Sequence, residues 1–307
     1  MTTAEQAIKH LVVGEENSGD RLDVFVSEEL EISRSHAQKL IKEGFVSVNN
    51  LVFTKVSKTV KTGQDATVLL PQPKPVEIIP QDIPLDIVYE DEYLAIVNKQ
   101  QGLTVHPAGE SFTNTLVNAL LFKIKNLSSI NGDVRRGIVH RLDKDTSGLM
   151  VVAKNDFAHV NLSSQIEKKE CRRIYFALVE GVLKTDSGTI NKPIARSKSD
   201  RKKMAVDTNG KKATTLYEVI NRYTDNTLVQ FELKTGRTHQ IRVHSSFLGH
   251  PIVGDKAYGF KKQKFNLQGQ LLHSKIIEFT HPYSKEIMRF ESPLPDYFLK
   301  VLSSIQS

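Results

Sequence analysis

The hydrophobic pattern of the first 70 residues predicts two helices followed by a β-hairpin. Within Arg21–Leu30, apolar residues recur at intervals of three and four, as on one face of a helix. Ser33 is a favourable N-cap for a second helix, and Gly44 is a favourable stop. In Phe45–Phe53, two short apolar runs flank Asn49-Asn50, which tolerate the left-handed conformations of a tight turn. We therefore expect a small N-terminal domain made of helices and a hairpin.

Beyond residue 85 the pattern changes to short strands with few helices between them. Strand-like runs follow one another across short turns, as in Leu216–Tyr223 and Thr227–Lys234 around Asp225-Asn226. Such neighbours pair antiparallel, so the sequence predicts an α+β domain on a mostly antiparallel central sheet. The other predicted strands are Asp86–Tyr89, Tyr93–Asn98, Gly148–Lys154, Ile174–Glu180, Ser274–Phe279 and Glu286–Phe290, and the predicted helices are Thr115–Lys123, one with an Asp156 cap, and Thr238–Leu248.

A proline-rich segment separates these two patterns. Pro71–Pro84 holds five of the 11 prolines of the chain. Proline fixes φ and removes a hydrogen-bond donor, so the segment is expected to be an extended, semi-rigid linker. The predicted organisation is a small domain over residues 15–70, a linker over 71–84, and a larger domain over 85–303.

The net charge and the cysteine content indicate which kind of partner and which cellular compartment to expect. The 307 residues include 42 Lys and Arg against 35 Asp and Glu, and the net charge of +7 favours a polyanionic partner. Cys171 is the only cysteine, which excludes an internal disulfide and a multi-cysteine metal site. Met1–Val13 lacks the pattern of a signal peptide, and apolar runs such as Leu149–Ala153 are too short to span a bilayer. We expect a soluble, cytoplasmic protein without a membrane partner.

Three polar motifs interrupt the hydrophobic pattern and could carry chemistry. GIVHRLDKDTSGLMVVAKN places Asp143 in a polar loop between two apolar strands, and KTGRTHQIRVH places Arg242 where a strand leads into a helix. The third motif is Tyr175 within RRIYFALVEG. An Asp beside a guanidinium is favoured in its ionised form and can act as nucleophile or base. On these residues alone, a structural buried ion pair is the favoured interpretation.

Two hydrolytic alternatives fit the spacing poorly. Ser147, His140 and Asp143 contain the residue types of a hydrolase triad, but the Gly-x-Ser-x-Gly elbow is absent. Asp143 and Asp145 are two residues apart, so in an extended segment they crowd onto one side instead of bracketing a sugar. Neither a Ser hydrolase nor a two-carboxylate glycosidase is therefore indicated.

The sequence predicts neither a metal site nor a cofactor. His239, His244 and His250 are separated by five and six residues, which does not align imidazoles on one helix face. The phosphate-cradling Gly-x-x-x-x-Gly-Lys motif and the dinucleotide fingerprint are both absent. Any reaction is expected to depend on the protein's own side chains.

Several long motifs, in order, resemble the RluA-type pseudouridine synthases. HRLDKDTSGLMVVAK resembles the family signature, TGRTHQIRVH with LGHPIVGDKAYG resembles its second block, and IYFALVEG resembles the segment with the family tyrosine. PQDIPLDIVYEDEYLAIVNK and GLTVHP resemble the start of the catalytic domain, with Gln100 where the family usually has proline, so the local loop should differ. RLDVFVSEELEISRSHAQKLIKEGFVSVNN is similar to the S-four-type RNA-binding module. The pairing is typical of the RluD-like branch, which acts on large-subunit ribosomal RNA.

The resemblance implies a cofactor-free isomerisation, in which the uridine glycosidic bond is broken, the base turns, and its carbon-five is joined to the ribose. Asp143 would be the catalytic aspartate, as nucleophile at the anomeric carbon or as base on the ribose. Tyr175 would stack against the uracil and help remove the carbon-five proton, and Arg242 would hold Asp143 charged and oriented. Arg141 would support the flipped-out nucleotide. Further substrate-binding residues, for which packing or capping is the open alternative, would be Leu272, Arg237 and His239.

The resemblance also gives a meaning to the basic residues outside these motifs. Arg34, Lys39 and Lys42 on the second helix, with Lys202 and Lys203, would hold RNA phosphates; a solvated charged surface is the alternative. We expect a monomer whose partner is large-subunit ribosomal RNA or a ribosome precursor. The sequence does not decide between ribosomal and transfer RNA. Two rival functions are a non-catalytic RNA-binding factor that keeps the fold and an RNA or DNA N-glycosidase that uses Asp143.

Overall fold

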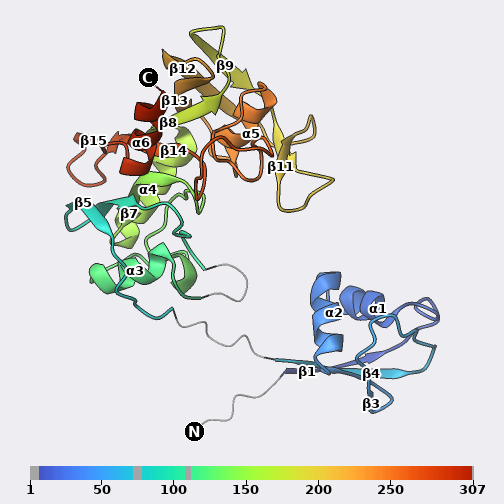
Figure 1. Ribbon diagram of the computed structural model, residues 1–307. Coiled ribbons are helices and arrows are strands. Elements are labelled where there is room, and N and C mark those ends of the chain that lie inside the picture. The colour runs from blue at the N-terminus through green and yellow to red at the C-terminus, as the bar shows by residue number, and fades with distance from the viewer. Residues whose placement is uncertain (1–6, 72–77, 108–111, 306–307) are drawn as a thin grey trace. The chain divides into compact units, whose positions relative to one another are not determined.

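The computed structural model describes residues 7–71, 78–107 and 112–305 (Figure 1). The chain divides into two compact units, residues 1–75 and 76–307, and each has a hydrophobic core of its own. A separate core is what allows each unit to be a domain. Over the described residues, no helix combines the length and apolar character needed to cross a bilayer.

The N-terminal unit packs two helices against a four-stranded antiparallel sheet. The predicted order of helix, helix and hairpin is confirmed, and Ser33 caps the second helix by accepting a hydrogen bond from the His36 N–H. Asn49 and Asn50 have φ values of 48° and 62° in the hairpin turn. The pattern missed the first strand because that strand is almost wholly exposed. The elements are β1 (Ala7–Val12), α1 (Leu22–Glu29), α2 (Arg34–Lys42), β2 (Val46–Val48), β3 (Leu51–Val52) and β4 (Asp65–Leu70), with strand order β1-β4-β2-β3.

A buried carboxylate ties the first turn of α1 to α2. Asp23 is fully buried and accepts hydrogen bonds from Arg21 and Arg34 at 2.9 Å and from Gln38 at 2.6 Å. Burial alone would raise the pKa of Asp23, but the hydrogen bonds from Arg21, Gln38 and Arg34 lower it below its usual value. The guanidinium groups of Arg21 and Arg34 stay about half exposed, so water shares them with the carboxylate.

Replacing Asp23 with Asn should loosen this unit. The loss of charge-assisted hydrogen bonds should cost the N-terminal unit about 1–3 kcal/mol. Because the folded-state pKa is lowered, the contribution is present above the usual pKa of 3.8 and is lost as the pH falls below it. Hydrogen exchange of the α1 and α2 amides in the full chain measures the effect. Glu28→Gln, on an exposed position of α1, is the control, and equal protection in both variants would contradict the expectation.

Part of the predicted proline linker packs on the second unit. Residues 72–77 lie outside the described residues. Ile78 is buried in the core of the second unit, and the Asn118 side chain donates to the Ile79 carbonyl oxygen at 2.8 Å. The Gln81 N–H donates to the Asn118 carbonyl oxygen at 3.0 Å. Residues 78–84 therefore do not form a free linker; proline content predicts extended backbone but not the surface that the backbone contacts.

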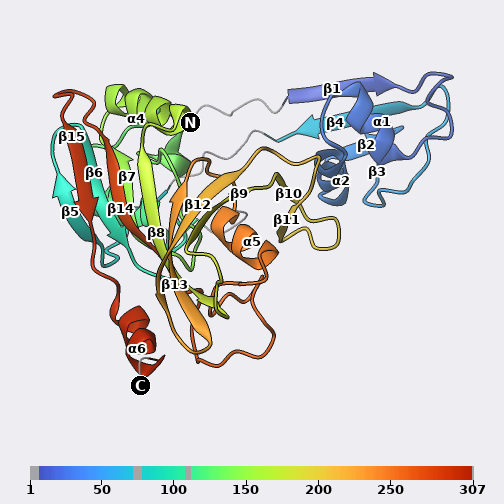
Figure 2. The ribbon, with the colours of Figure 1, turned by 90° about the horizontal axis from the view of Figure 1, so that it is seen from above.

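The second unit is built on a mostly antiparallel sheet, as predicted. The strand order is β5-β6-β7-β14-β8-β13-β12-β9, with β15 paired to β14, and Figure 2 shows the central strands side by side. Among the described strands of this sheet, the β14–β7 pairing alone is parallel. The strands are β5 (Asp86–Glu90), β6 (Leu94–Lys99), β7 (Ser147–Ala153), β8 (Arg172–Glu180), β9 (Ser187–Asn191), β12 (Thr214–Arg222), β13 (Asn226–Leu233), β14 (Leu272–Thr280) and β15 (Ile287–Glu291), and a separate hairpin consists of β10 (Ile194–Arg196) and β11 (Met204–Val206).

Alternating side chains of the central strands divide between the two faces of the sheet. In β6, Ala95 and Val97 pack in the cluster that contains helix α3 (Leu116–Lys123), whereas Leu94 and Ile96 pack with helix α4 (Asp156–Lys168). The hydrophobic pattern did not reveal the last helix, α6 (Asp296–Ile305), which packs Phe298 in a cluster with residues of β8 and β13. Tyr175 lies in the α3 cluster, so that face carries the candidate chemistry. The helices are α3 (Leu116–Lys123), a 3₁₀ turn (Asp133–Arg135), α4 (Asp156–Lys168), α5 (Gln240–Phe247) and α6 (Asp296–Ile305).

Three details of the predicted elements were wrong. Asn155, not Asp156, caps α4, because its side chain accepts from the Ala158 N–H at 2.9 Å. The predicted helix at Thr238–Leu248 begins only at Gln240, because His239 has a left-handed backbone with φ of 57°. Asn226 belongs to β13 and not to the turn, and its side chain is buried.

Gly148 lies where the loop containing Asp143 enters the sheet. Its φ of 114° suits glycine, and a Cβ built there would lie 2.3 Å from the Ser274 carbonyl oxygen of β14. The neighbour is backbone held in the parallel pairing of Ser274 with Gly148, so it cannot turn away as a side chain could.

Gly148→Ala should therefore destabilise the second unit by roughly 3 kcal/mol or more. Gly249→Ala is the matched control, since Gly249 also has a positive φ of 83° but has open space around its Cβ position. The control should cost only about 1 kcal/mol, from the left-handed backbone alone. Thermal unfolding followed by far-UV circular dichroism measures both, and similar losses would refute the steric argument.

Candidate active site

Asp143 lies in a loop that is fixed from both sides. The Thr146 N–H donates to the Asp143 carbonyl oxygen at 3.1 Å, which closes a turn just before β7. Lys99, at the end of β6, is fully buried, and its Nζ donates to the carbonyl oxygens of Gln100, Leu103 and Lys144 at 2.9–3.0 Å. Burial lowers the pKa of Lys99 to about 7, although Asp143 and Asp145 favour its charged form. Lys99 could not be recognised from the sequence, since nothing in its neighbourhood marks this lysine as buried.

Arg242, from α5, joins two carboxylates. Its Nη1 donates to Asp143 Oδ2 at 3.0 Å, while Nε and Nη2 donate to the two carboxylate oxygens of Asp255 at 2.7 and 2.9 Å. The side chain of Asp255 is fully buried, and that of Arg242 is 10% exposed. Burial works against both charges, but the hydrogen bonds and charge of Arg242 lower the pKa of Asp255. The fold thus brings Asp143 and Arg242, which are 99 residues apart in the sequence, into contact.

His239 lies on the other side of the Asp143 carboxylate. Its Nε2 is 3.8 Å from Asp143 Oδ1, and its Nδ1 is 2.8 Å from the hydroxyl of Tyr258. Burial lowers the pKa of His239, against the opposing effect of Asp143, and Arg242 lowers it further. Tyr258 also places its ring 5.0 Å from the Arg242 guanidinium carbon. Asp255 and Tyr258 were missed as site residues, although both lie in the quoted motif LGHPIVGDKAYG.

The remaining predicted substrate residues surround Asp143. Tyr175 and Leu272 are buried, and they line a cavity of about 50 Å³ together with Asp143, Arg141 and Arg237. Burial raises the pKa of the Tyr175 phenol, so the hydroxyl keeps its proton at neutral pH. Arg141 and Arg237 are exposed at the rim, and all but Leu272 also line an adjoining cleft of about 450 Å³. The structure therefore brings these five residues together.

The predicted RNA-binding residues lie on the surfaces of the two units. Arg34, Lys39 and Lys42 are exposed along α2, and Lys39 approaches Glu43 at 3.8 Å. Lys202 and Lys203 lie in the turn between β10 and β11, where Lys202 is exposed and Lys203 is half-buried. Their exposure fits phosphate contacts and a solvated surface equally well.

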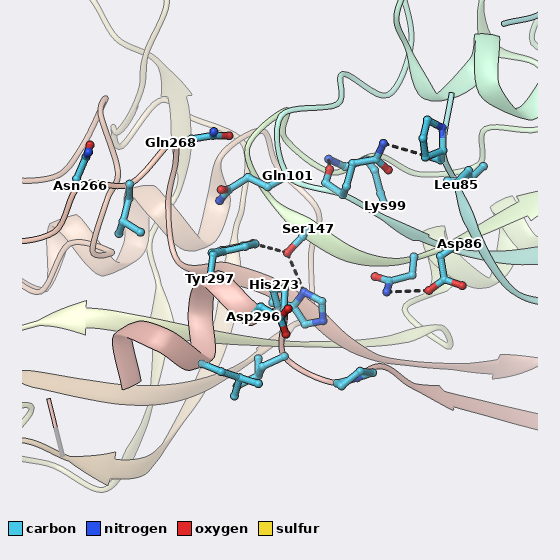
Figure 3. A pocket seen from close by; sticks show the side chains of 18 of the residues that line it. Leu85, Asp86, Lys99, Gln101, Ser147, Asn266, Gln268, His273, Asp296 and Tyr297 are labelled. Atoms are coloured by element: carbon cyan, nitrogen blue, oxygen red, sulfur yellow. Dashed lines mark hydrogen bonds between the residues drawn. The ribbon is translucent and has the colours of Figure 1, made fainter. Parts of the chain in front are cut away.

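A second cavity of about 1160 Å³ lies away from Asp143 (Figure 3). Figure 3 shows the Ser147 hydroxyl between His273 and Tyr297, at 2.8 and 2.7 Å. His273 and Leu272 are adjacent in β14 and point to opposite faces of the sheet, so Ser147 is directed away from the cavity of Leu272. In the same region, Gln100 donates to the Pro84 carbonyl oxygen at 2.9 Å, a contact that proline at this position could not make.

The other histidine-based alternatives are not assembled. His140 is buried, its Nε2 accepts from the Val151 N–H at 3.1 Å, and burial lowers its pKa to about 3, so it does not contact Ser147 as a base. His244 is hydrogen-bonded to Thr215 and to the Lys192 carbonyl oxygen. In the described part of the chain, no three His, Cys, Asp or Glu side chains are grouped as metal ligands would be.

Comparison with known proteins gives matches over almost the whole chain. The profile described as RNA pseudouridylate synthase matches residues 93–247, and that of the S4 domain matches residues 20–65. The uncharacterized RNA pseudouridine synthase YlyB of Bacillus subtilis (strain 168) is 43% identical over 297 residues, which cover 96% of this chain and 97% of that protein. The ribosomal large subunit pseudouridine synthase D of Pseudomonas aeruginosa is 41% identical over 304 residues, or 95% of this chain and 93% of that protein.

A solved structure supports the fold of the second unit. Human RNA pseudouridylate synthase domain containing 4 superimposes with a TM-score of 0.57 at 23% identity, over 72% of this chain and 93% of that one. The catalytic profile and the near full-length relatives extend this likeness from the fold to the family. The chain, as its motifs predicted, belongs to the RluA-type RNA pseudouridine synthases, isomerases that convert uridine in RNA to pseudouridine, and it is RluD-like with an N-terminal S4 domain.

Proposed function

We propose that the protein isomerises specific uridines of large-subunit ribosomal RNA, with Asp143 as the essential carboxylate and without a cofactor. The observation that carries the proposal is the 3.0 Å contact between Asp143 Oδ2 and Arg242, at a cavity that Tyr175 and Leu272 also line. The names of several relatives, such as the large subunit enzyme of Pseudomonas aeruginosa, support the choice of RNA. We expect it to act as a monomer in the cytoplasm.

The contacts of Asp143 suggest different roles for its two carboxylate oxygens: one is bound by Arg242, and the other is open to the substrate. Oδ2 accepts from Arg242, whereas Oδ1 has His239 at 3.8 Å, beyond hydrogen-bond distance. Oδ1 is therefore the oxygen we assign to the reaction, either as nucleophile at the anomeric carbon or as base on the ribose. Asp255 holds Arg242 in place through two further hydrogen bonds. Arg242 can therefore keep the Asp143 carboxylate oriented when the substrate binds.

The neighbouring side chains suit a uridine taken out of its stack. Tyr175 offers an aromatic face on which uracil can stack. Its hydroxyl keeps its own proton, so it can accept the carbon-five proton, once the base has turned, only while it donates its own proton to water in the adjoining cleft. Arg141 and Arg237 at the rim can hold the extruded nucleotide, whose unstacking costs a few kcal/mol. The cleft of about 450 Å³ gives the space that the cavity beside Asp143 lacks.

Asp143→Asn should abolish turnover and leave RNA binding nearly unchanged. Loss of the reactive carboxylate should slow single-turnover pseudouridine formation by roughly a thousandfold or more. The assay uses RNA with tritium at carbon-five of its uridines and follows tritium release and free uracil. Asp145→Asn, in the same loop, is the control and should keep the activity of the natural protein.

The same assay separates the rival functions. Tritium release without free uracil supports isomerisation, and free uracil supports an N-glycosidase. Neither product, with ribosome-derived large-subunit RNA as substrate, supports a binding factor. An Asp143→Asn variant that keeps full turnover would remove Asp143 from the mechanism.

The double variant Lys39→Glu, Lys42→Glu should weaken RNA binding and spare the chemical step. Reversing two phosphate-facing charges on α2 should raise the dissociation constant by roughly tenfold and flatten its salt dependence. Lys55→Glu with Lys61→Glu, on exposed positions of the same unit, is the charge-matched control. Single-turnover rates at saturating RNA should match in all three proteins; a collapse of that rate in the α2 variant would contradict a pure binding role.

A further inference from the structure

Arg173 is a buried cation to which the arrangement around Asp143 gives no role. It lies in β8, two residues before Tyr175, so both side chains point to the same face of the sheet. Only 5% of Arg173 is exposed. Its Nε donates to no protein acceptor, and across the described residues no carboxylate oxygen lies within 4.0 Å of its guanidinium.

Other arginines of this region show how unusual that is. Arg172, the preceding residue, is half exposed and still pairs with Glu232 at 3.0 Å and Glu278 at 3.6 Å. Arg242 is buried but has two carboxylates. An unpaired buried charge is costly to keep in a folded protein, so a site that retains one is suited to receive an anion from outside the chain.

The surroundings of Arg173 leave room for such an anion. Arg173 lines the cleft of about 450 Å³ that also contains Asp143 and Tyr175. A Cβ on Gly236 would lie 3.2 Å from the Arg173 Nη1, so glycine at this position keeps the backbone close and the guanidinium unobstructed. The carboxylates of the lining are Asp143, which Arg242 already binds, and Glu167, which is exposed on α4. The other charged groups of the lining are cations: Arg141, Lys169, Lys234 and Arg237.

We propose that Arg173 binds a phosphodiester group of the RNA chain, next to the nucleotide presented to Asp143. A guanidinium offers two parallel N–H donors that match two phosphate oxygens, and its charge is compensated only when the phosphate is present. The inference rests on the proposed function for the identity of the ligand. It adds a contact that fixes the backbone of the extruded nucleotide from the floor of the cleft, while Arg141 and Arg237 act at its rim.

The first test compares Arg173→Met with Arg172→Met, its neighbour on the same strand. Arg173→Met should weaken binding of large-subunit RNA roughly ten- to hundredfold, as expected for lost hydrogen bonds to a charged group. The salt slope of its binding should fall by roughly one phosphate contact. Arg173→Lys should lie between, because it keeps the charge but loses the paired donors. Arg172→Met should bind as the natural protein does.

Thermal unfolding separates a binding role from a structural one. Arg173→Met should unfold at a temperature no lower than the natural protein, because it removes an unpaired buried charge. Natural-type RNA affinity and salt slope in both Arg173 variants would overturn the proposal. A large drop in the unfolding temperature of Arg173→Met, with unchanged RNA binding by the folded Arg173→Lys protein, would overturn it as well.

Inorganic phosphate tests the site without RNA. At constant ionic strength set with sodium chloride, phosphate should raise the unfolding temperature of the natural protein and of Arg172→Met, but not that of Arg173→Met. Equal shifts in all three would overturn an anion site at Arg173. A phosphate effect that depends on Arg173, in a protein that forms no pseudouridine in the tritium assay, would keep the anion site and reject the proposed reaction, so the two failures are distinguishable. A phosphate effect without any change in RNA affinity would show that free phosphate, and not the RNA backbone, is the ligand.

Discussion

The bridge from Asp255 through Arg242 to Asp143 is the interaction on which the candidate site depends. The Arg242 guanidinium donates two hydrogen bonds to the fully buried carboxylate of Asp255 and one to the carboxylate of Asp143, which faces the cavity. The buried Asp255 fixes Arg242, and Arg242 in turn fixes Asp143, so the orientation of the carboxylate at the cavity is set from the interior. Since removal of one member of a buried ion pair is strongly destabilising, Arg242 and Asp255 should tolerate little substitution, whereas Asp143 is partly open to the cavity and its charge is less costly to remove.

The sequence predicted the parts of this unit that carry local signals. Asp143 and Arg242 lie in polar motifs at the ends of apolar strands, and the helix, hairpin and strand patterns follow from side-chain periodicity. Asp255 lies in a family motif, but nothing local marks it as the partner of Arg242, and nothing local marks Lys99 as buried. The importance of both residues comes from burial and from partners that the fold brings to them. The left-handed backbone of His239 and the packing of Ile78 were also unpredictable, since both are imposed by tertiary contacts.

Three buried basic side chains of the second unit are stabilised in different ways. Two carboxylates compensate the charge of Arg242, which positions Asp143. Arg173, two residues before Tyr175, has no carboxylate partner among the described residues. Lys99 is a third case, in which three backbone carbonyl oxygens replace a counterion and tie the Asp143 loop to β6. The three buried basic side chains thus differ in how they are compensated, and among them Arg173 alone has no carboxylate or carbonyl partner in the described part of the chain.

Cys171, the residue before β8, is 2% exposed, and burial raises the pKa of its thiol to about 11. A thiol of this kind reacts slowly with alkylating reagents, because the thiolate is the reactive species and is both scarce and shielded. The natural protein should therefore react very slowly with maleimide dyes. A cysteine introduced at an exposed position of each unit would then be labelled selectively. Paired dyes placed in this way would report, by energy transfer, on the distance between the S4 domain and the catalytic unit before and after RNA is added.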